Sequence, residues 1–117
     1  MPSDIPPDMP PDTLPDRPEP DDIIHQPLRL RIMAALNAGD GKGEEFDFAR
    51  LKSLTQSSDG NLGAHIETLE RAHYVEVERG YRGRRPRMVV RPTPQGLRAY
   101  RNHVAFLRSV IEGQGQV

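Results

Sequence analysis

Six arginines and no acidic residue stand within the thirteen residues 79–91, RGYRGRRPRMVVR. A guanidinium is permanently charged, and its planar set of donors suits phosphate oxygens. Gly80 and Gly83 supply the backbone freedom of turns, so the run predicts a hairpin with a basic tip. The candidate phosphate contacts are Arg82, Arg84, Arg85 and Arg87. An isolated charged run is usually a solvated loop. Whether these arginines are phosphate contacts therefore depends on the neighbouring elements.

The charge of the whole chain conceals an uneven distribution. The 117 residues have a formal net charge of −1. Residues 1–22 hold eight prolines, one arginine and seven acids, which leaves fifteen basic and ten acidic residues, a net charge of +5, in residues 23–117. We therefore predict a disordered, Pro/Asp-rich acidic tail at 1–22 and one basic domain at 23–117. A basic domain favours a polyanionic partner, although solubility alone is an alternative explanation.

Several classes of protein are disfavoured by composition. Cysteine is absent, so thiolate metal sites and disulfides are excluded, and His25, His65, His73 and His103 lack the spacing of a metal site and are interpreted as polar flanks. We predict no metal and no cofactor. No stretch approaches the roughly 20 apolar residues of a membrane span, which favours a cytoplasmic protein and no membrane partner. Ser57, Ser58, Asp59 and His65 could be a hydrolase cluster, but serine and aspartate before a helix are ordinary caps, so we expect no enzyme.

The first elements are predicted from periodicity and from caps. Pro27 suits the first turn of a helix whose core-facing residues are Leu28, Ile32, Ala35 and Leu36. Glycines at 39 and 41 end it. A short strand at 45–47 follows, and Asp47 can cap a helix that ends near Gln56 and turns Phe48, Leu51 and Leu54 inward.

A third helix is predicted at 59–73. Leu62, Ile66 and Leu69 form its core-facing stripe, and the opposite face carries Gly60, Ala64, Thr68 and Arg71, with Asn61 and Glu67 beside them. A purely solubilising face would be rich in Lys and Glu. Small residues there allow the backbone to come close to a partner.

The last part of the body predicts a hairpin and a helix. Val75 and Val77 alternate with glutamates in a half-buried strand, and Pro86 restricts its own strand to an edge or a bulge. Thr93 can cap a C-terminal helix at 93–112. Its apolar residues at spacings of three and four are Leu97, Tyr100, Val104, Leu107 and Ile111. An adjoining stripe of Ala99, Phe106 and Val110 favours self-association over one wide core-facing stripe, so we predict a homodimer through this helix.

These elements and motifs resemble a known family. The order is helix, short strand, helix, turn, helix, basic hairpin and helix, with the motifs Asp59-Gly60-Asn61-Leu62, His65, Leu69-Glu70, Tyr74-Val75, Arg85-Pro86-Arg87, Thr93-Pro94 and Gly96. Over about residues 25–111 the chain looks like the small stand-alone winged helix-turn-helix regulators of the MarR and ArsR groups. The resemblance implies a mainly α fold with a small β-hairpin, a homodimer and transcriptional control. The chain departs from the pattern of these groups in several places. Such regulators often have a serine and a larger polar or basic residue at the positions of Gly63 and Ala64. They often have a glycine at the position of His73 and a threonine at that of Met88.

A duplex would suit both parts of this arrangement. An α-helix fits the major groove, where Asn61 can pair with adenine, Arg71 can reach phosphate or guanine, and Thr68 and the methyl of Ala64 can contact base edges. The arginines of the 79–91 hairpin, or wing, would lie on the backbone or in the minor groove. We therefore predict a homodimeric, sequence-specific regulator that binds double-stranded DNA. Small pockets between the dimer helices could hold an unidentified small-molecule effector, but no residue identifies one. The alternative is a winged-helix module that binds protein and has no affinity for DNA.

Overall fold

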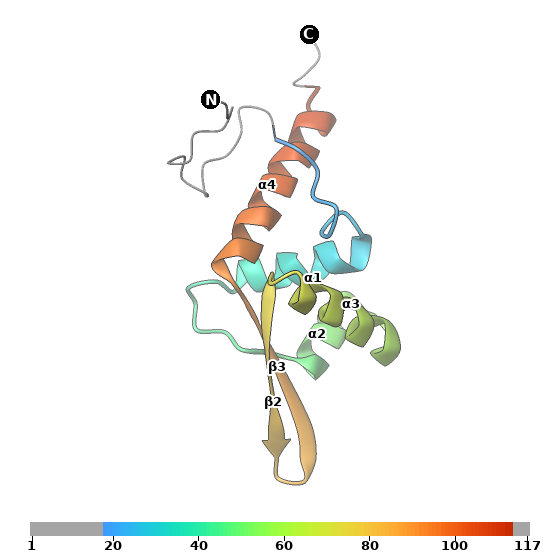
Figure 1. The fold of residues 1–117 in the computed structure, drawn as a ribbon, viewed down its shortest axis with the longest axis vertical. Coiled ribbons are helices and arrows are strands. Elements are labelled where there is room, and N and C mark those ends of the chain that lie inside the picture. The colour runs from blue at the N-terminus through green and yellow to red at the C-terminus, as the bar shows by residue number, and fades with distance from the viewer. Residues whose placement is uncertain (1–17, 114–117) are drawn as a thin grey trace, which may run out of the picture.

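The computed structural model describes residues 18–113, which form four helices and a three-stranded antiparallel sheet (Figure 1). The elements are α1 (Pro27–Ala38), β1 (Phe46–Asp47), α2 (Phe48–Thr55), α3 (Asp59–Arg71), β2 (Val75–Arg82), β3 (Arg85–Pro92) and α4 (Pro94–Ile111). Helices α1 to α3 gather beside the upper part of the sheet, the β2–β3 hairpin points away from them, and α4 extends in the opposite direction (Figure 1). The predicted winged helix-turn-helix fold is confirmed.

The helices begin where side chains can satisfy their free N–H groups. Asp47 accepts from the Arg50 N–H at 2.8 Å, and Thr93 Oγ1 accepts from the Gly96 N–H at 2.9 Å. Before α3 the cap is Ser58, whose Oγ accepts from the Asn61 N–H at 3.2 Å. Asp59 is therefore the first helical residue and does not cap; its carboxylate lies in the first turn, where the helix dipole favours a negative charge.

The core lies where α1, α2 and α3 meet the sheet. Its fully buried members include Ile32, Met33, Leu36, Leu51, Leu62, Ile66, Leu69, Val75 and Val90. One predicted core residue is wrong: the side chain of Leu54 is 55% exposed. The buried position at the end of α2 belongs to Thr55, whose hydroxyl is satisfied because it donates to the Leu51 carbonyl at 2.8 Å.

The sheet has the order β1-β3-β2, so β3 is its central strand. Strand β1 reaches β3 only at Val89 and Val90, which leaves Pro86 in a stretch whose one neighbour is β2, as its missing N–H requires. The hairpin turns at residues 83–84, with Gly83 in the left-handed region at φ 64°. Gly80 lies within β2 and not in the turn, contrary to the prediction.

Helix α4 begins in close contact with the body. Gly96 lies so close to the Tyr74 carbonyl that a Cβ atom there would overlap it. Further along, His103 is only 2% exposed, so its interpretation as a polar flank is wrong. Its Nδ1 accepts from the Asp21 N–H at 3.0 Å, and burial holds the pKa of His103 below its usual value, so the ring is neutral near pH 7.

Asp21 fastens the segment before α1 to the body. Its Oδ2 accepts from the Tyr74 hydroxyl at 2.7 Å, and its Oδ1 accepts from the N–H groups of Ile23 and Ile24. Ile24 is fully buried in the core. Most of the predicted acidic tail, residues 1–17, lies outside the described residues, and the division of the chain at residue 22 stays a prediction.

Candidate nucleic-acid interface

The outer face of α3 is open to solvent. Gly60, Asn61, Ala64, Glu67 and Arg71 are exposed, whereas the three residues of the predicted inner stripe are buried. Thr68 is half-buried, and its hydroxyl donates to the Ala64 carbonyl at 3.2 Å, which leaves the oxygen as an acceptor. The four predicted contacts of this helix, Asn61, Ala64, Thr68 and Arg71, therefore share its outward half.

The two flanks of that face differ in charge. On the flank toward the wing, Glu70 receives a bidentate pair of hydrogen bonds from Arg79 of β2, at 3.0 and 3.2 Å, which lowers the pKa of this carboxyl. Asp59 and Glu67 share this flank by helical periodicity and pair with Lys52 at 2.8 Å and with Arg71 at 3.7 Å. The opposite flank carries Asn61, His65 and Thr68 and holds no acid.

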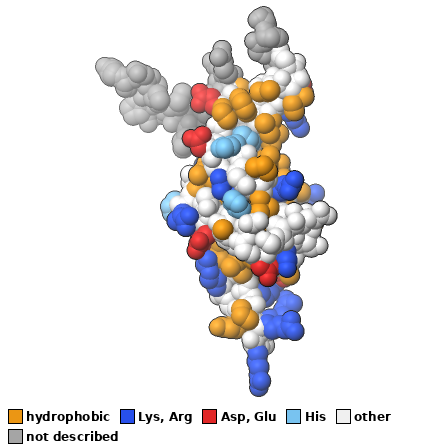
Figure 2. All heavy atoms as spheres, turned by 90° about the vertical axis from the view of Figure 1, so that its right-hand side faces the viewer, with side chains coloured by type: hydrophobic (Ala, Val, Ile, Leu, Met, Phe, Trp, Pro, Cys, Tyr) orange, Lys and Arg blue, Asp and Glu red, His pale blue; other side chains and the backbone are white. Residues whose placement is uncertain are grey.

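The arginines of the wing fall into two groups. Arg87 pairs with Glu45 at 2.5 Å and Arg91 pairs with Glu78 at 2.7 Å. By contrast, no ion pair within residues 18–113 involves the three exposed arginines next to the turn, Arg82, Arg84 and Arg85. We call these three the tip arginines. Figure 2 shows Lys and Arg side chains gathered at this narrow end of the molecule. Arg87, also predicted to bind phosphate, is held by Glu45 and is 24% exposed, and its contact with phosphate stays a prediction.

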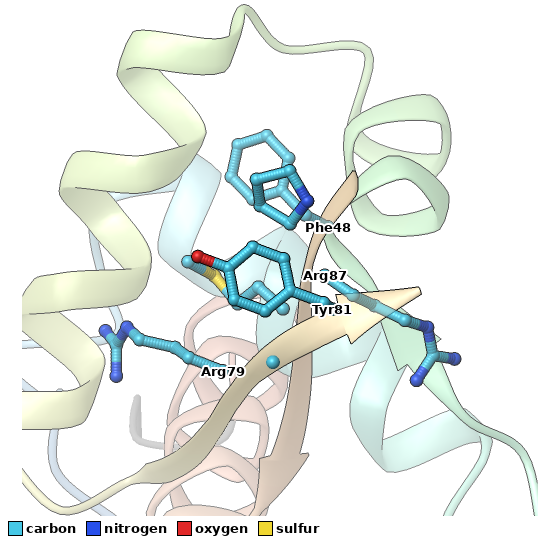
Figure 3. Close-up of a pocket in the computed structure, with 7 residues that line it drawn as sticks. Phe48, Arg79, Tyr81 and Arg87 are labelled. Carbon is cyan, nitrogen blue, oxygen red and sulfur yellow. The ribbon is translucent and has the colours of Figure 1, made fainter. Parts of the chain in front are cut away.

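Strand alternation gives the wing two unlike faces. Cross-strand partners share a face, so Arg82, Arg85 and Arg87 lie on one side, and Tyr81 with its partner Pro86 lies on the other. The second side borders a hollow of about 480 Å³ whose lining includes Phe48, Tyr81, Pro86 and Met88 (Figure 3). Tyr81 is 76% exposed. The sequence interpretation missed this hollow, although the alternation Val75, Val77, Arg79, Tyr81 marks the strand face that forms it.

Residues 18–113 contain neither an assembled hydrolase site nor a cluster of metal ligands. Ser58 caps α3, the Ser57 hydroxyl lies 2.8 Å from that of Thr55, and His65 Nδ1 lies 3.0 Å from Arg29 Nη1, so these side chains do not pair as nucleophile and base. Within residues 18–113 no three His, Cys, Asp or Glu side chains gather as metal ligands would. In the same range no helix has the length and apolarity needed to cross a membrane.

Comparison with known proteins agrees with this geometry. Residues 28–111 match the family model described as a winged helix DNA-binding domain. The chain belongs to this winged helix family. It is similar to the structure of a transcriptional regulator homologue from Pyrococcus horikoshii OT3, with a TM-score of 0.67 and 30% identity over 80% of this chain and 88% of that one.

Two further similarities are weaker. The uncharacterized protein MJ0432 of Methanocaldococcus jannaschii is 29% identical over 83 residues, 70% of this chain and 85% of that protein. The crystal structure of AF1382 from Archaeoglobus fulgidus has a TM-score of 0.55 and 20% identity over 75% of this chain and 88% of that one, which supports the fold alone.

The turn after α3 holds a residue in an unfavourable backbone conformation. His73 follows the end of α3 with φ 65°, in the left-handed region. A residue with a Cβ atom is disfavoured there by about 1 kcal/mol or more. The turn is kept because the Tyr74 N–H donates to the Leu69 carbonyl at 2.9 Å and the Thr93 hydroxyl donates to the His73 carbonyl at 2.7 Å.

The predicted dimerisation residues of α4 separate into two sets. Leu97 is 8% exposed and Tyr100 packs against the core, so both serve their own domain. Val104 and Leu107 are half-buried, and Ile111 is 79% exposed beside Val110 at 62%. The apolar surface left for a partner is therefore the C-terminal half of the helix.

Proposed function

We propose that this winged helix protein is a sequence-specific, double-stranded DNA-binding transcriptional regulator that acts as a homodimer. The observation that carries the proposal is the contrast between the unpaired tip arginines and the paired acids of α3. Free cations stand at the end of the wing, and each acid on the exposed flank of the recognition helix already has a cation. A phosphate backbone would therefore meet net positive charge. The regulatory role is supported by the similarity to the Pyrococcus regulator homologue.

In this proposal α3 enters the major groove. Asn61 offers a donor and an acceptor to adenine, Arg71 reaches guanine or phosphate, and Ala64 and Thr68 contact neighbouring base edges. Gly60 and Ala64 have small side chains, so the backbone of α3 can approach the bases closely. The tip arginines lie on the backbone or in the adjacent minor groove.

The direct test is duplex binding measured against salt concentration. Three tip arginines on each of two protomers give six phosphate contacts, and at about 0.9 per contact these arginines alone contribute about −5 to the slope of log affinity against log salt. A two-fold dimer would read half-sites roughly 34 Å apart, so a palindromic footprint is expected. A slope near zero would contradict the proposal, and a footprint on one half-site would contradict the dimer.

The dimer has its own test in sedimentation equilibrium. An acid at the exposed end of α4, in Leu107→Asp or Ile111→Asp, should dissociate the dimer because it would place a charge in an apolar contact. The control is Lys42→Asp, which introduces an acid in the exposed loop before β1. A monomeric wild-type chain, or dimers that survive both α4 substitutions, would reject α4 as the interface.

A small-molecule effector also has a candidate place. The hollow between Phe48 and Tyr81 lies within the usual volume range of ligand sites, roughly 300–1,000 Å³, and an apolar aromatic ligand there would touch both α2 and the wing. The probe is anilinonaphthalene sulfonate, whose fluorescence rises on apolar surfaces. Tyr81→Ser should abolish that rise and Ile111→Ser should retain it. The reverse pattern would place the apolar site on α4.

A further inference from the structure

A polar cleft lies on the side of α3 that faces away from the wing. It has a volume of about 410 Å³ and lies between the start of α1, the turn after α2 and the first half of α3. Its polar lining includes Gln26, Arg31, Gln56, Ser57, Asn61 and His65. Among residues 18–113, no acidic residue lines it. The cleft therefore combines one cation with several neutral polar groups.

The donors available in the cleft can be counted from the hydrogen bonds already made. Arg31 is exposed and takes part in no ion pair of residues 18–113. Thr55 donates to the Leu51 carbonyl, so in its contact with Ser57 the serine must be the donor, and that hydroxyl is committed. The side-chain amides of Gln26, Gln56 and Asn61 remain as donors beside Arg31.

His65 supplies a further donor because of its neighbour. Arg29 is held by its Nε, which donates to the Ile23 carbonyl at 2.6 Å, and its Nη1 lies 3.0 Å from His65 Nδ1. A guanidinium can only donate, so Nδ1 accepts and the proton of the neutral ring is on Nε2. Burial, and then the charge of Arg29, lower the pKa of His65, so the neutral ring with its Nε2–H is the form near pH 7.

We propose that this cleft binds a phosphodiester of the DNA backbone, next to the bases that α3 reads. The inference rests on the proposed function. Asn61 belongs both to the exposed face of α3 and to the cleft, so a strand in contact with that face continues into it. The acids of α3 lie on the other flank. The backbone would thus be held at two places on opposite sides of the recognition helix, by the tip arginines and by Arg31.

The test compares Arg31→Gln with the wild type in duplex binding across a range of salt concentrations. Loss of one phosphate contact per protomer should make the slope about 2 less steep for a dimer, and at 0.1 M salt should weaken binding roughly tenfold per cleft. Random and specific duplexes should weaken alike, because a phosphate contact carries no base information. Arg31→Lys should restore the slope. The control, Arg98→Gln, removes the same charge from α4 and should leave the slope unchanged.

The outcomes separate the two proposals. A wild-type chain that does not bind duplex DNA rejects the proposed function, and the cleft proposal with it. A wild-type chain with a steep slope that Arg31→Gln retains rejects the cleft alone. Inorganic phosphate provides the other arm: if it shifts the NMR signals of the cleft in the wild type while Arg31→Gln leaves duplex binding unaltered, the cleft takes free phosphate compounds and the backbone assignment is wrong.

Discussion

The sharpest prediction concerns two arginines at the tip of the wing. Arg84→Ala with Arg85→Ala removes four of the six tip contacts of a dimer. The slope of log affinity against log salt should therefore become about 3.6 less steep, which at 0.1 M salt corresponds to a loss of roughly three to four orders of magnitude in affinity. Both residues are exposed and make no ion pair within the described range, so folding should be unaffected.

The same wing supplies a matched control. Arg87→Ala with Arg91→Ala also removes two positive charges, but from side chains that already pair with Glu45 and with Glu78. The charge of each of these arginines is already balanced by a glutamate, so the control should lose much less affinity. Fluorescence anisotropy with a labelled duplex at several salt concentrations measures both variants.

The reasoning would be refuted if the paired arginines proved as important as the tip arginines, or if the tip variant kept the wild-type slope. A wild-type chain without duplex affinity that still captures a protein partner through α3 would favour the interaction module that the sequence left as the alternative. Unfolding monitored by circular dichroism checks that neither double substitution has disturbed the domain.

Three further predictions concern stability, each measured from urea unfolding. Gly96→Ala should destabilise by about 1–3 kcal/mol or more, because its Cβ would overlap the Tyr74 carbonyl and α4 would have to shift; no loss would mean that this contact is loose. His73→Gly should stabilise by up to about 1 kcal/mol by relieving a left-handed φ, and a loss would show that the histidine side chain contributes more than the strain costs. Burial lowers the pKa of His103 in the folded protein. Between that pKa and the ordinary value near 6.5 the unfolded chain binds more protons than the folded one. The free energy of unfolding should therefore decrease as the pH falls from about 7.5 to 5.5. His65 shifts in the same direction, so a residual dependence should persist in His103→Gln; an unchanged dependence would refute the assignment to His103.

The parts of the fold that were predicted are those specified by neighbouring residues. Thr93 and the proline after it define the start of α4, and the stripe of α3 follows from residues three and four apart. Both Gly80 and Gly83 were predicted to lie in the turn of the wing. Gly83 does, but Gly80 lies within strand β2. Local sequence therefore identified the elements and most of their boundaries.

Two features that were missed in the sequence involve partners that are distant along the chain. His103 was taken for a surface residue because its hydrogen-bond partner, Asp21, is 82 residues away. No sequence pattern indicated that Arg87 pairs with Glu45, which is 42 residues away. Such pairings depend on topology and leave no periodic signal. The error at Leu54 is local: this residue was placed inward on apolarity alone, but a threonine can take a buried helical position when its hydroxyl bonds back to the helix.

Residues 23–117 carry a net charge of +5, and the pairing of their acids decides where the excess positive charge is exposed. The acids of the exposed α3 flank are paired with basic side chains, and so are Glu45 and Glu78 beside the wing. The electric fields of these pairs largely cancel at a distance. The cations proposed to bind phosphate stand at two places, the wing tip and the cleft beside α1. In the proposed complex, two backbone contacts on opposite sides of one helix would fix its position and its rotation in the groove, which a single contact would leave free. The proposed base-reading face could then consist of few and small residues, because the phosphates on either side would set its orientation.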